Sequence, residues 1–194
     1  MPLTREHKQK TRARIVAAAR RLFNKRGFNP VPIDDIMAEA GLTRGGFYNH
    51  FKAKEELYAE ALSAFADSAK TAVEESSRRG PALATSFIRS YISRRHLKSV
   101  ENQCPLIALP SDVARAGSPV RKAYEGILRN LVGMFQEAAP DEGGLTARER
   151  SLASAALCVG AMVLARTVDD KSLANEICDA SRKLAEGTIV PRNL

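Results

Sequence analysis

A short stretch near the N-terminus, GLTRGGFYNHF, holds side chains suited to contacting a nucleic acid. Arg44 is able to form paired hydrogen bonds to a guanine edge, and Thr43 beside it adds a hydroxyl group. Tyr48, His50 and, a little further along, Lys54 are donors of the kind that phosphate oxygens accept. Each of these residue types is commoner as an ordinary core or surface side chain. Their occurrence together, after a glycine turn, favours a nucleic-acid contact.

The net positive charge is concentrated in the same part of the chain. The whole sequence carries a formal charge of +8. Residues 1–54 hold 12 basic and 4 acidic side chains, whereas the other 140 residues hold 18 of each. A basic N-terminal segment favours a polyanionic partner, although many charge runs are only solvated faces.

Three predicted helices position the candidate contacts. Apolar side chains recur at helical spacing over residues 4–26, with lysine and arginine on the other faces. A short helix is predicted over residues 33–40, and Gly41 ends it. Thr43 is the expected N-cap of a third helix that runs through about Asn49. A long helix followed by two short ones across a tight turn is typical of a helix-turn-helix.

Two adjacent glycines, Gly45 and Gly46, lie inside the third predicted helix. Glycine in a helix interior costs roughly 1 kcal/mol relative to alanine. Phe47 and Phe51 are four residues apart and are expected to face inward and anchor this weak helix. The missing side chains would let the helix backbone approach a duplex closely. We therefore interpret the segment as a helix that is narrow enough to fit a DNA groove.

The rest of the chain is predicted to be helical, so the expected fold class is all-α. The predicted helices cover about residues 54–77, 82–99, 105–115, 119–138, 146–167 and 170–187. Thr146 with Glu149 three residues later has the pattern of a capping box. The expected organisation is a three-helix helix-turn-helix DNA-binding domain at 1–53 and a larger all-helical domain at 54–194.

Several other classes of protein are disfavoured. The three cysteines are widely spaced, which predicts a reducing cytoplasm and no structural metal or cofactor. The longest uncharged apolar run is too short to span a bilayer, and the basic helix lacks the Trp and Leu face of a membrane anchor. The scattered histidines form no catalytic constellation, so an enzyme is not expected. A nonspecific architectural DNA-binding protein stays open as the alternative.

The segment GFNPVPIDDIMAEAGLTRGGFYNHFKAKEELYAEAL resembles the N-terminal domain of TetR/AcrR-type transcriptional regulators. The resemblance implies a ligand-responsive repressor that binds a palindromic operator in double-stranded DNA as a homodimer. By that similarity the DNA-contacting positions are Thr43, Arg44, Gly46, Tyr48, His50 and Lys54. One departure concerns the start of the second helix, where Val31 and Pro32 offer no hydroxyl group to cap the helix or touch a phosphate.

The resemblance also implies that residues 54–194 form an all-helical ligand-binding and dimerisation domain. Dimerisation is expected through the last two long helices, at about 119–138 or 146–167, and 170–187. A small-molecule effector is expected between the middle helices, with candidate contacts Phe87, Tyr91, Tyr124 and Leu128. Cys104, in a Cys-Pro-Leu stretch at a predicted helix start, is a candidate sensor of electrophiles, although a plain packing role is the commoner one for a buried cysteine.

Overall fold

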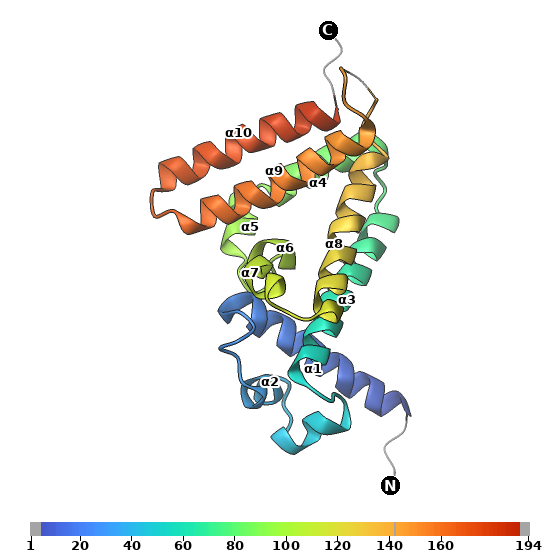
Figure 1. Ribbon diagram of the computed structural model, residues 1–194, viewed down its shortest axis with the longest axis vertical. Helices are drawn as coiled ribbons and strands as arrows, with labels where there is room; N and C mark the ends of the chain where they lie inside the picture. Colours follow the sequence, from blue (N-terminus) through green and yellow to red (C-terminus); the bar gives the residue numbers. More distant parts are fainter. Residues whose placement is uncertain (1–4, 142, 191–194) are drawn as a thin grey trace. The chain divides into compact units, whose positions relative to one another are not determined.

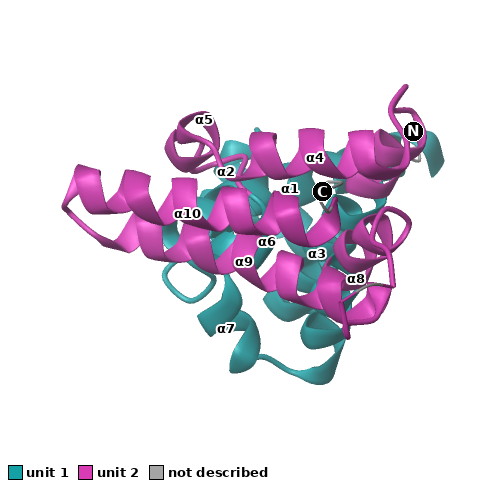
Figure 2. Cartoon of the chain, turned by 90° about the horizontal axis from the view of Figure 1, so that it is seen from above, with its two compact units in different colours: residues 1–67, 104–127 teal, residues 68–103, 128–194 magenta. Residues whose placement is uncertain are grey.

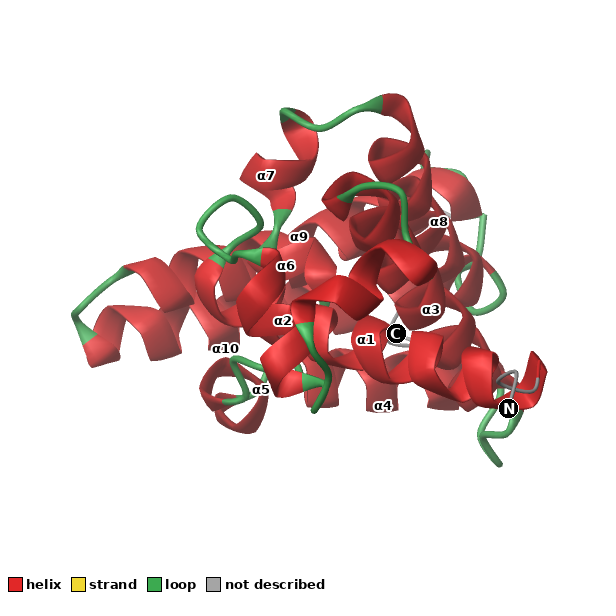
Figure 3. Cartoon of the chain, turned by 90° about the horizontal axis from the view of Figure 1, so that it is seen from below, coloured by secondary structure: helices red, strands yellow, loops and turns green. Residues whose placement is uncertain are grey.

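A computed structural model describes residues 5–141 and 143–190, and within these ranges it contains helices and loops but no strand (Figures 1 and 3). This confirms the all-α class. Helix α1 spans Arg5–Arg26, α2 spans Ile33–Glu39, and a 3₁₀ helix, η1, spans Arg44–Asn49. The first predicted helix was placed from Thr4, which lies outside the described residues.

The third helix differs from its prediction in two respects. It is a 3₁₀ helix rather than an α-helix, and Thr43 stands at the N-cap position without a side-chain hydrogen bond to the helix. Both differences follow from weak local helix formation, since two of its six residues are glycines. The turn before it matches the expectation, because Gly41 adopts a φ of +67°, which side chains rarely tolerate.

Buried apolar side chains join the three N-terminal helices. Phe23 of α1 and Met37 of α2 are 1% exposed, and Ile15 of α1 is fully buried. Phe47 is also fully buried and Phe51 is 1% exposed, with ring centroids 5.6 Å apart. The inward orientation of these two phenylalanines is therefore confirmed, and their packing supports η1.

The remaining helices follow in chain order. They are α3 (Lys54–Glu74), α4 (Gly80–Tyr91), α5 (Arg94–Lys98), α6 (Pro105–Ala108), α7 (Pro110–Ala114), α8 (Ser118–Gln136), α9 (Ala147–Thr167) and α10 (Lys171–Ile189). The predicted capping box is confirmed, because the Thr146 hydroxyl accepts from the Glu149 amide at 3.2 Å and the Glu149 carboxylate accepts from the Thr146 amide at 2.8 Å.

Two predicted helices are each broken in two. The helix expected at 82–99 is divided into α4 and α5, because the Ser93 hydroxyl caps a new helix by accepting from the His96 amide at 3.2 Å. The helix expected at 105–115 is divided into α6 and α7, because Pro110 has no amide hydrogen and fits only a first helical turn.

The chain forms two compact units (Figure 2). Unit 1 comprises residues 1–67 and 104–127, so α6, α7 and the first part of α8 pack with the N-terminal helices. Unit 2 comprises residues 68–103 and 128–194, where α10 packs on α9 and α4. The functional domain boundary at 53/54 is a different division of the chain and stays a prediction. No helix of the described part combines the length and apolar character needed to cross a bilayer.

Candidate nucleic-acid interface

The outer surface of η1 carries most of the candidate DNA contacts. Phe47 points into the core, while the next residue, Tyr48, is 63% exposed and meets the Phe47 ring edge-on at 5.2 Å. Thr43 and Arg44 are also exposed. With Gly46, which also lies in η1, the structure therefore brings four of the six predicted DNA contacts to one short surface element that is held in place from inside.

Arg44 forms an exposed ion pair within the chain, which a contact with DNA could replace. Its guanidinium lies 2.8 Å from a carboxylate oxygen of Asp34 in the first turn of α2, and the two side chains are 69% and 53% exposed. Exposed ion pairs of this kind contribute at most about 1 kcal/mol. The pair therefore orients the guanidinium beside η1 without competing strongly against a guanine edge.

Neither glycine of η1 is required by the fold. Gly45 and Gly46 have negative φ angles, unlike Gly27 and Gly41. A Cβ atom built on Gly45 meets nothing within 4 Å, and one on Gly46 makes only an ordinary 3.5 Å contact with Met37. Internal packing therefore leaves room for alanine at both positions. The use of glycine here is consistent with a close approach of DNA to the backbone of η1.

His50 follows η1 with its Nδ1 atom buried and without a hydrogen-bond partner among the described residues. Burial lowers the pKa of His50, and the positive charges of Lys8 and Arg12 lower that pKa further. The free protein therefore holds a neutral imidazole at neutral pH. A neutral ring donates through one nitrogen only, so a phosphate contact would be a single Nε2–H bond.

We expect DNA affinity to increase as the pH falls from about 7.5 to about 6, because a nearby phosphate favours the charged imidazole and raises the pKa of His50 in the complex. Binding then takes up a proton, which lower pH favours. Fluorescence anisotropy on the parent and on His50→Gln checks this, since the two proteins differ only at this imidazole. Identical pH slopes in the two proteins would contradict a His50–phosphate contact.

Lys54, the sixth predicted contact, is used inside unit 1. Its Nζ donates to the main-chain oxygens of Phe28 at 2.5 Å and Asn29 at 3.4 Å, and lies 4.3 Å from the centre of the Phe28 ring. Burial lowers the pKa of Lys54. The ammonium therefore closes the turn between α1 and α2, and a phosphate would have to draw it away from these carbonyl groups.

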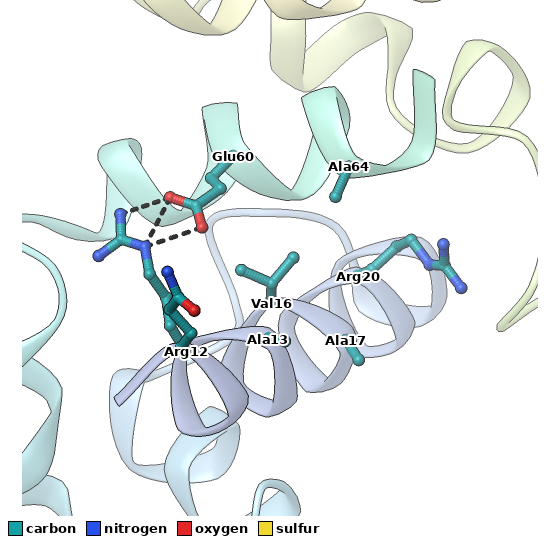
Figure 4. A pocket seen from close by; sticks show the side chains of 8 residues that line it. Arg12, Ala13, Val16, Ala17, Arg20, Glu60 and Ala64 are labelled. Carbon is teal, nitrogen blue, oxygen red and sulfur yellow. Dashed lines mark hydrogen bonds and ion pairs between the residues drawn. The ribbon is translucent and has the colours of Figure 1, made fainter. Parts of the chain in front are cut away.

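A second basic residue, Arg12 of α1, was not among the predicted site residues. Its Nε donates to Glu60 of α3 at 2.8 Å (Figure 4). Its NH1 donates to the main-chain oxygen of His50. The guanidinium also lies 4.0 Å from the centre of the Phe51 ring. Arg12 thus ties α1 and α3 to the end of the recognition segment, at one side of a groove of about 330 Å³.

The candidate sensor and effector residues are distributed over both units. In unit 1, Cys104 is buried at the start of α6, and the Tyr124 hydroxyl donates to the main-chain oxygen of Leu106 at 3.1 Å. Burial, with a smaller contribution from Cys104, raises the pKa of Tyr124 to about 12. In unit 2, the rings of Phe87 and Tyr91 stack with centroids 5.2 Å apart, and Leu128 also belongs to this unit.

Helix α6 is shorter than the sequence predicted. It contains four residues, so the helix dipole offered to Cys104 is much smaller than that of the expected helix over 105–115. No cluster of His, Cys, Asp or Glu within the described ranges is arranged to hold a metal ion.

Residues 15–61 match the family model described as bacterial regulatory proteins of the tetR family. Over 54 residues the chain is 50% identical to the HTH-type transcriptional regulator TtgR of Pseudomonas putida, covering 28% of this chain and 26% of that one. The helix-turn-helix therefore resembles that of TetR/AcrR-type regulators. An uncharacterised HTH-type regulator of Bacillus subtilis, YfiR, is 31% identical over 90 residues, covering 46% of this chain and 43% of that one.

The similarity of fold extends over nearly the whole chain. SCO4454, a TetR-family transcriptional regulator from Streptomyces coelicolor, superposes with a TM-score of 0.72, covering 93% of this chain and 95% of that one at 23% identity. The sequence matches to the curated relatives, in contrast, span less than half of the length of those relatives. The family resemblance in sequence therefore concentrates in the helix-turn-helix.

Proposed function

We propose that this protein is a cytoplasmic, ligand-responsive transcriptional repressor of the TetR/AcrR family, not an enzyme, that binds a palindromic operator as a homodimer. The observation that carries the proposal is the design of η1. On its inner side, Phe47 is fully buried and anchors the helix. On its outer side, Arg44 and Tyr48 face solvent, and two glycines between them leave that part of the backbone without side chains. Such an element suits insertion into a major groove.

Selection of bound fragments from a random DNA pool tests the proposal most directly. A homodimer with two recognition segments selects a palindrome whose half-sites lie about one helical turn, roughly 34–36 Å, apart. An architectural protein would return fragments without a shared motif, and that outcome would overturn the proposed function.

Arg44→Ala is expected to weaken binding by about 1–3 kcal/mol at the one base pair that Arg44 contacts. The reason is that Arg44 supplies base recognition, whereas its ion pair with Asp34 is weak. Binding to a panel of single-base operator variants checks this. Lys52→Gln, which removes one nearby charge, is the control and should weaken binding to all sequences equally. A uniform loss for Arg44→Ala would favour the architectural alternative.

Helices α9 and α10 offer the surface that suits dimerisation. They pack against each other in unit 2 (Figure 1), yet Leu152 and Leu164 on α9 and Leu173 and Leu184 on α10 are between 44% and 59% exposed. No large apolar side chain of α8 is comparably exposed among the described residues. Of the two predicted combinations, α9 with α10 therefore has the stronger support. Homodimers commonly bury such a face against its symmetry mate.

Cys104→Ser tests the electrophile response. The proposal expects N-ethylmaleimide to release DNA from the parent but not from Cys104→Ser, because modification would enlarge a buried side chain at the start of α6. Cys158→Ser is the control, since burial raises the pKa of Cys158 to about 12 and keeps that thiol unreactive. Release from Cys104→Ser at the parent's rate, measured by anisotropy, would end the sensor hypothesis.

A further inference from the structure

A cavity of about 380 Å³ lies in unit 2 at the junction of α4 and α5. Its volume falls within the range of pockets that hold small organic ligands. Its lining combines three aromatic residues, Phe87, Tyr91 and His96, with Arg95 and with three serines of the same stretch. Aromatic surface beside a cation is suited to a planar ligand that carries negative charge.

The aromatic side of the cavity is pre-formed. Phe87 and Tyr91 stack at 5.2 Å with their planes 26° apart, and His96 meets Tyr91 edge-on at 4.8 Å. Phe135 of α8, in the same unit, supports Phe87 edge-on at 5.8 Å. These contacts fix the rings before any ligand arrives, so little conformational entropy is lost on binding.

The polar groups at the α4–α5 junction hold the local backbone. Nδ1 of His96 lies 2.8 Å from the main-chain oxygen of Tyr91, and since a carbonyl oxygen only accepts, this nitrogen carries the proton. The Ser93 hydroxyl donates to the main-chain oxygen of Ser90 at 2.7 Å. Burial lowers the pKa of His96, so the imidazole is neutral at neutral pH. Arg95 is therefore the one permanent charge among the lining residues.

The chain segment that includes the cavity lining is basic. Residues 78–98 contain six arginines and lysines and no acidic residue. Arg89 is neutralised by Glu186 at 2.9 Å, and Arg94 donates to Asn175 at 3.1 Å. Arg95, in contrast, is exposed and forms no ion pair with any described residue. Its guanidinium is left to bind a partner from solution.

We propose that the α4–α5 cavity binds a planar aromatic anion, with its ring against Phe87 and Tyr91 and its carboxylate or sulfonate on Arg95. This inference rests on the proposed effector response and assigns that response a chemical class. The guanidinium pairs with the anionic group in the two-pronged geometry that carboxylates and sulfonates share. A neutral ligand of the same shape gains only the aromatic contact.

Two dyes of matched shape test the proposal on the full-length protein: 1-anilinonaphthalene-8-sulfonate, which is anionic, and N-phenyl-1-naphthylamine, which is the same frame without the sulfonate. Arg95→Gln should weaken binding of the anionic dye about tenfold, as expected for loss of a partly exposed charged hydrogen bond. Lys98→Gln removes the same charge from α5 outside the cavity lining and should change the affinity less than twofold. The neutral dye should bind both variants like the parent.

Phe87→Leu provides a second, independent test, because it should weaken the binding of both dyes by a similar factor. The proposal would be overturned if Arg95→Gln and Lys98→Gln lost affinity for the anionic dye equally, or if neither variant lost affinity for it. Binding to the selected operator tests the proposed function independently of dye binding. Arg95→Gln should bind the operator like the parent in the absence of dye, and a failure to select any operator would refute the regulator while leaving the dye result to decide the cavity.

Discussion

Replacing Phe47 with alanine is expected to lower the free energy of unfolding of unit 1 by about 3–5 kcal/mol and to abolish specific DNA binding. The side chain is fully buried against Phe51 and is the principal anchor of η1. Truncation of a buried phenylalanine removes its apolar contacts and leaves a cavity. A helix with two glycines has little intrinsic stability to compensate. Urea denaturation followed by circular dichroism measures the loss.

Tyr48→Ala is the matched control for Phe47→Ala. The two aromatic rings are adjacent in sequence, but Tyr48 is 63% exposed and its removal opens no core cavity. We expect its unfolding free energy to fall by less than about 1 kcal/mol, since surface substitutions have small effects. Its DNA affinity should fall through the lost phosphate donor. Equal destabilisation by the two variants would contradict the division of η1 into an inner anchor and an outer contact surface.

Leu184→Glu is expected to convert the proposed homodimer to monomers, raising the dimer dissociation constant about 100-fold or more. Leu184 is 59% exposed in the protomer, so the folded monomer loses little by the change. In a two-fold interface the substitution places a glutamate from each protomer in an apolar surface, and burying an unpaired charge costs several kcal/mol. Light scattering at micromolar concentration measures the mass.

Lys183→Glu is the control for Leu184→Glu, because it introduces the same acidic group one residue earlier in α10. Lys183 is exposed and polar already, so the dimer should persist. Leu164→Glu, on α9, should behave like Leu184→Glu if both helices share the interface. A dimer that survives both leucine substitutions would direct attention to the other predicted helix, α8. Operator affinity should fall with the dimer, because one half-site alone retains only part of the contacts.

Local signals accounted for much of the fold. The i, i+3, i+4 spacing of apolar residues, the glycine turn at Gly41 and the capping box at Thr146 each act within a few residues, so they could be recognised without tertiary information. The anchors Phe47 and Phe51 followed from the same spacing. Errors arose where one local signal outweighed another. Ser93 and Pro110 each begin a new helix inside a stretch whose apolar pattern continues.

The pairing of charged side chains could not be inferred from local pattern. Arg12 and Glu60 are 48 residues apart, and the Phe28 amide donates to Asp112 across 84 residues at 2.9 Å. No periodicity relates such positions, because their distance is set by helix packing. The same packing turned Lys54 toward the carbonyl groups of the α1–α2 turn, which the spacing of the recognition motif did not indicate.

By itself, the amino-acid sequence determined the helical class, the helix-turn-helix and the outward position of Arg44 and Tyr48, because helix periodicity and turn chemistry are local properties of the chain. Only the tertiary structure decided which cations are engaged. It paired Arg12 and Lys54 with internal partners and left Arg95 beside the stacked rings of Phe87 and Tyr91. Ion pairing depends on distances between separate helices, and those distances exist only once the helices have packed.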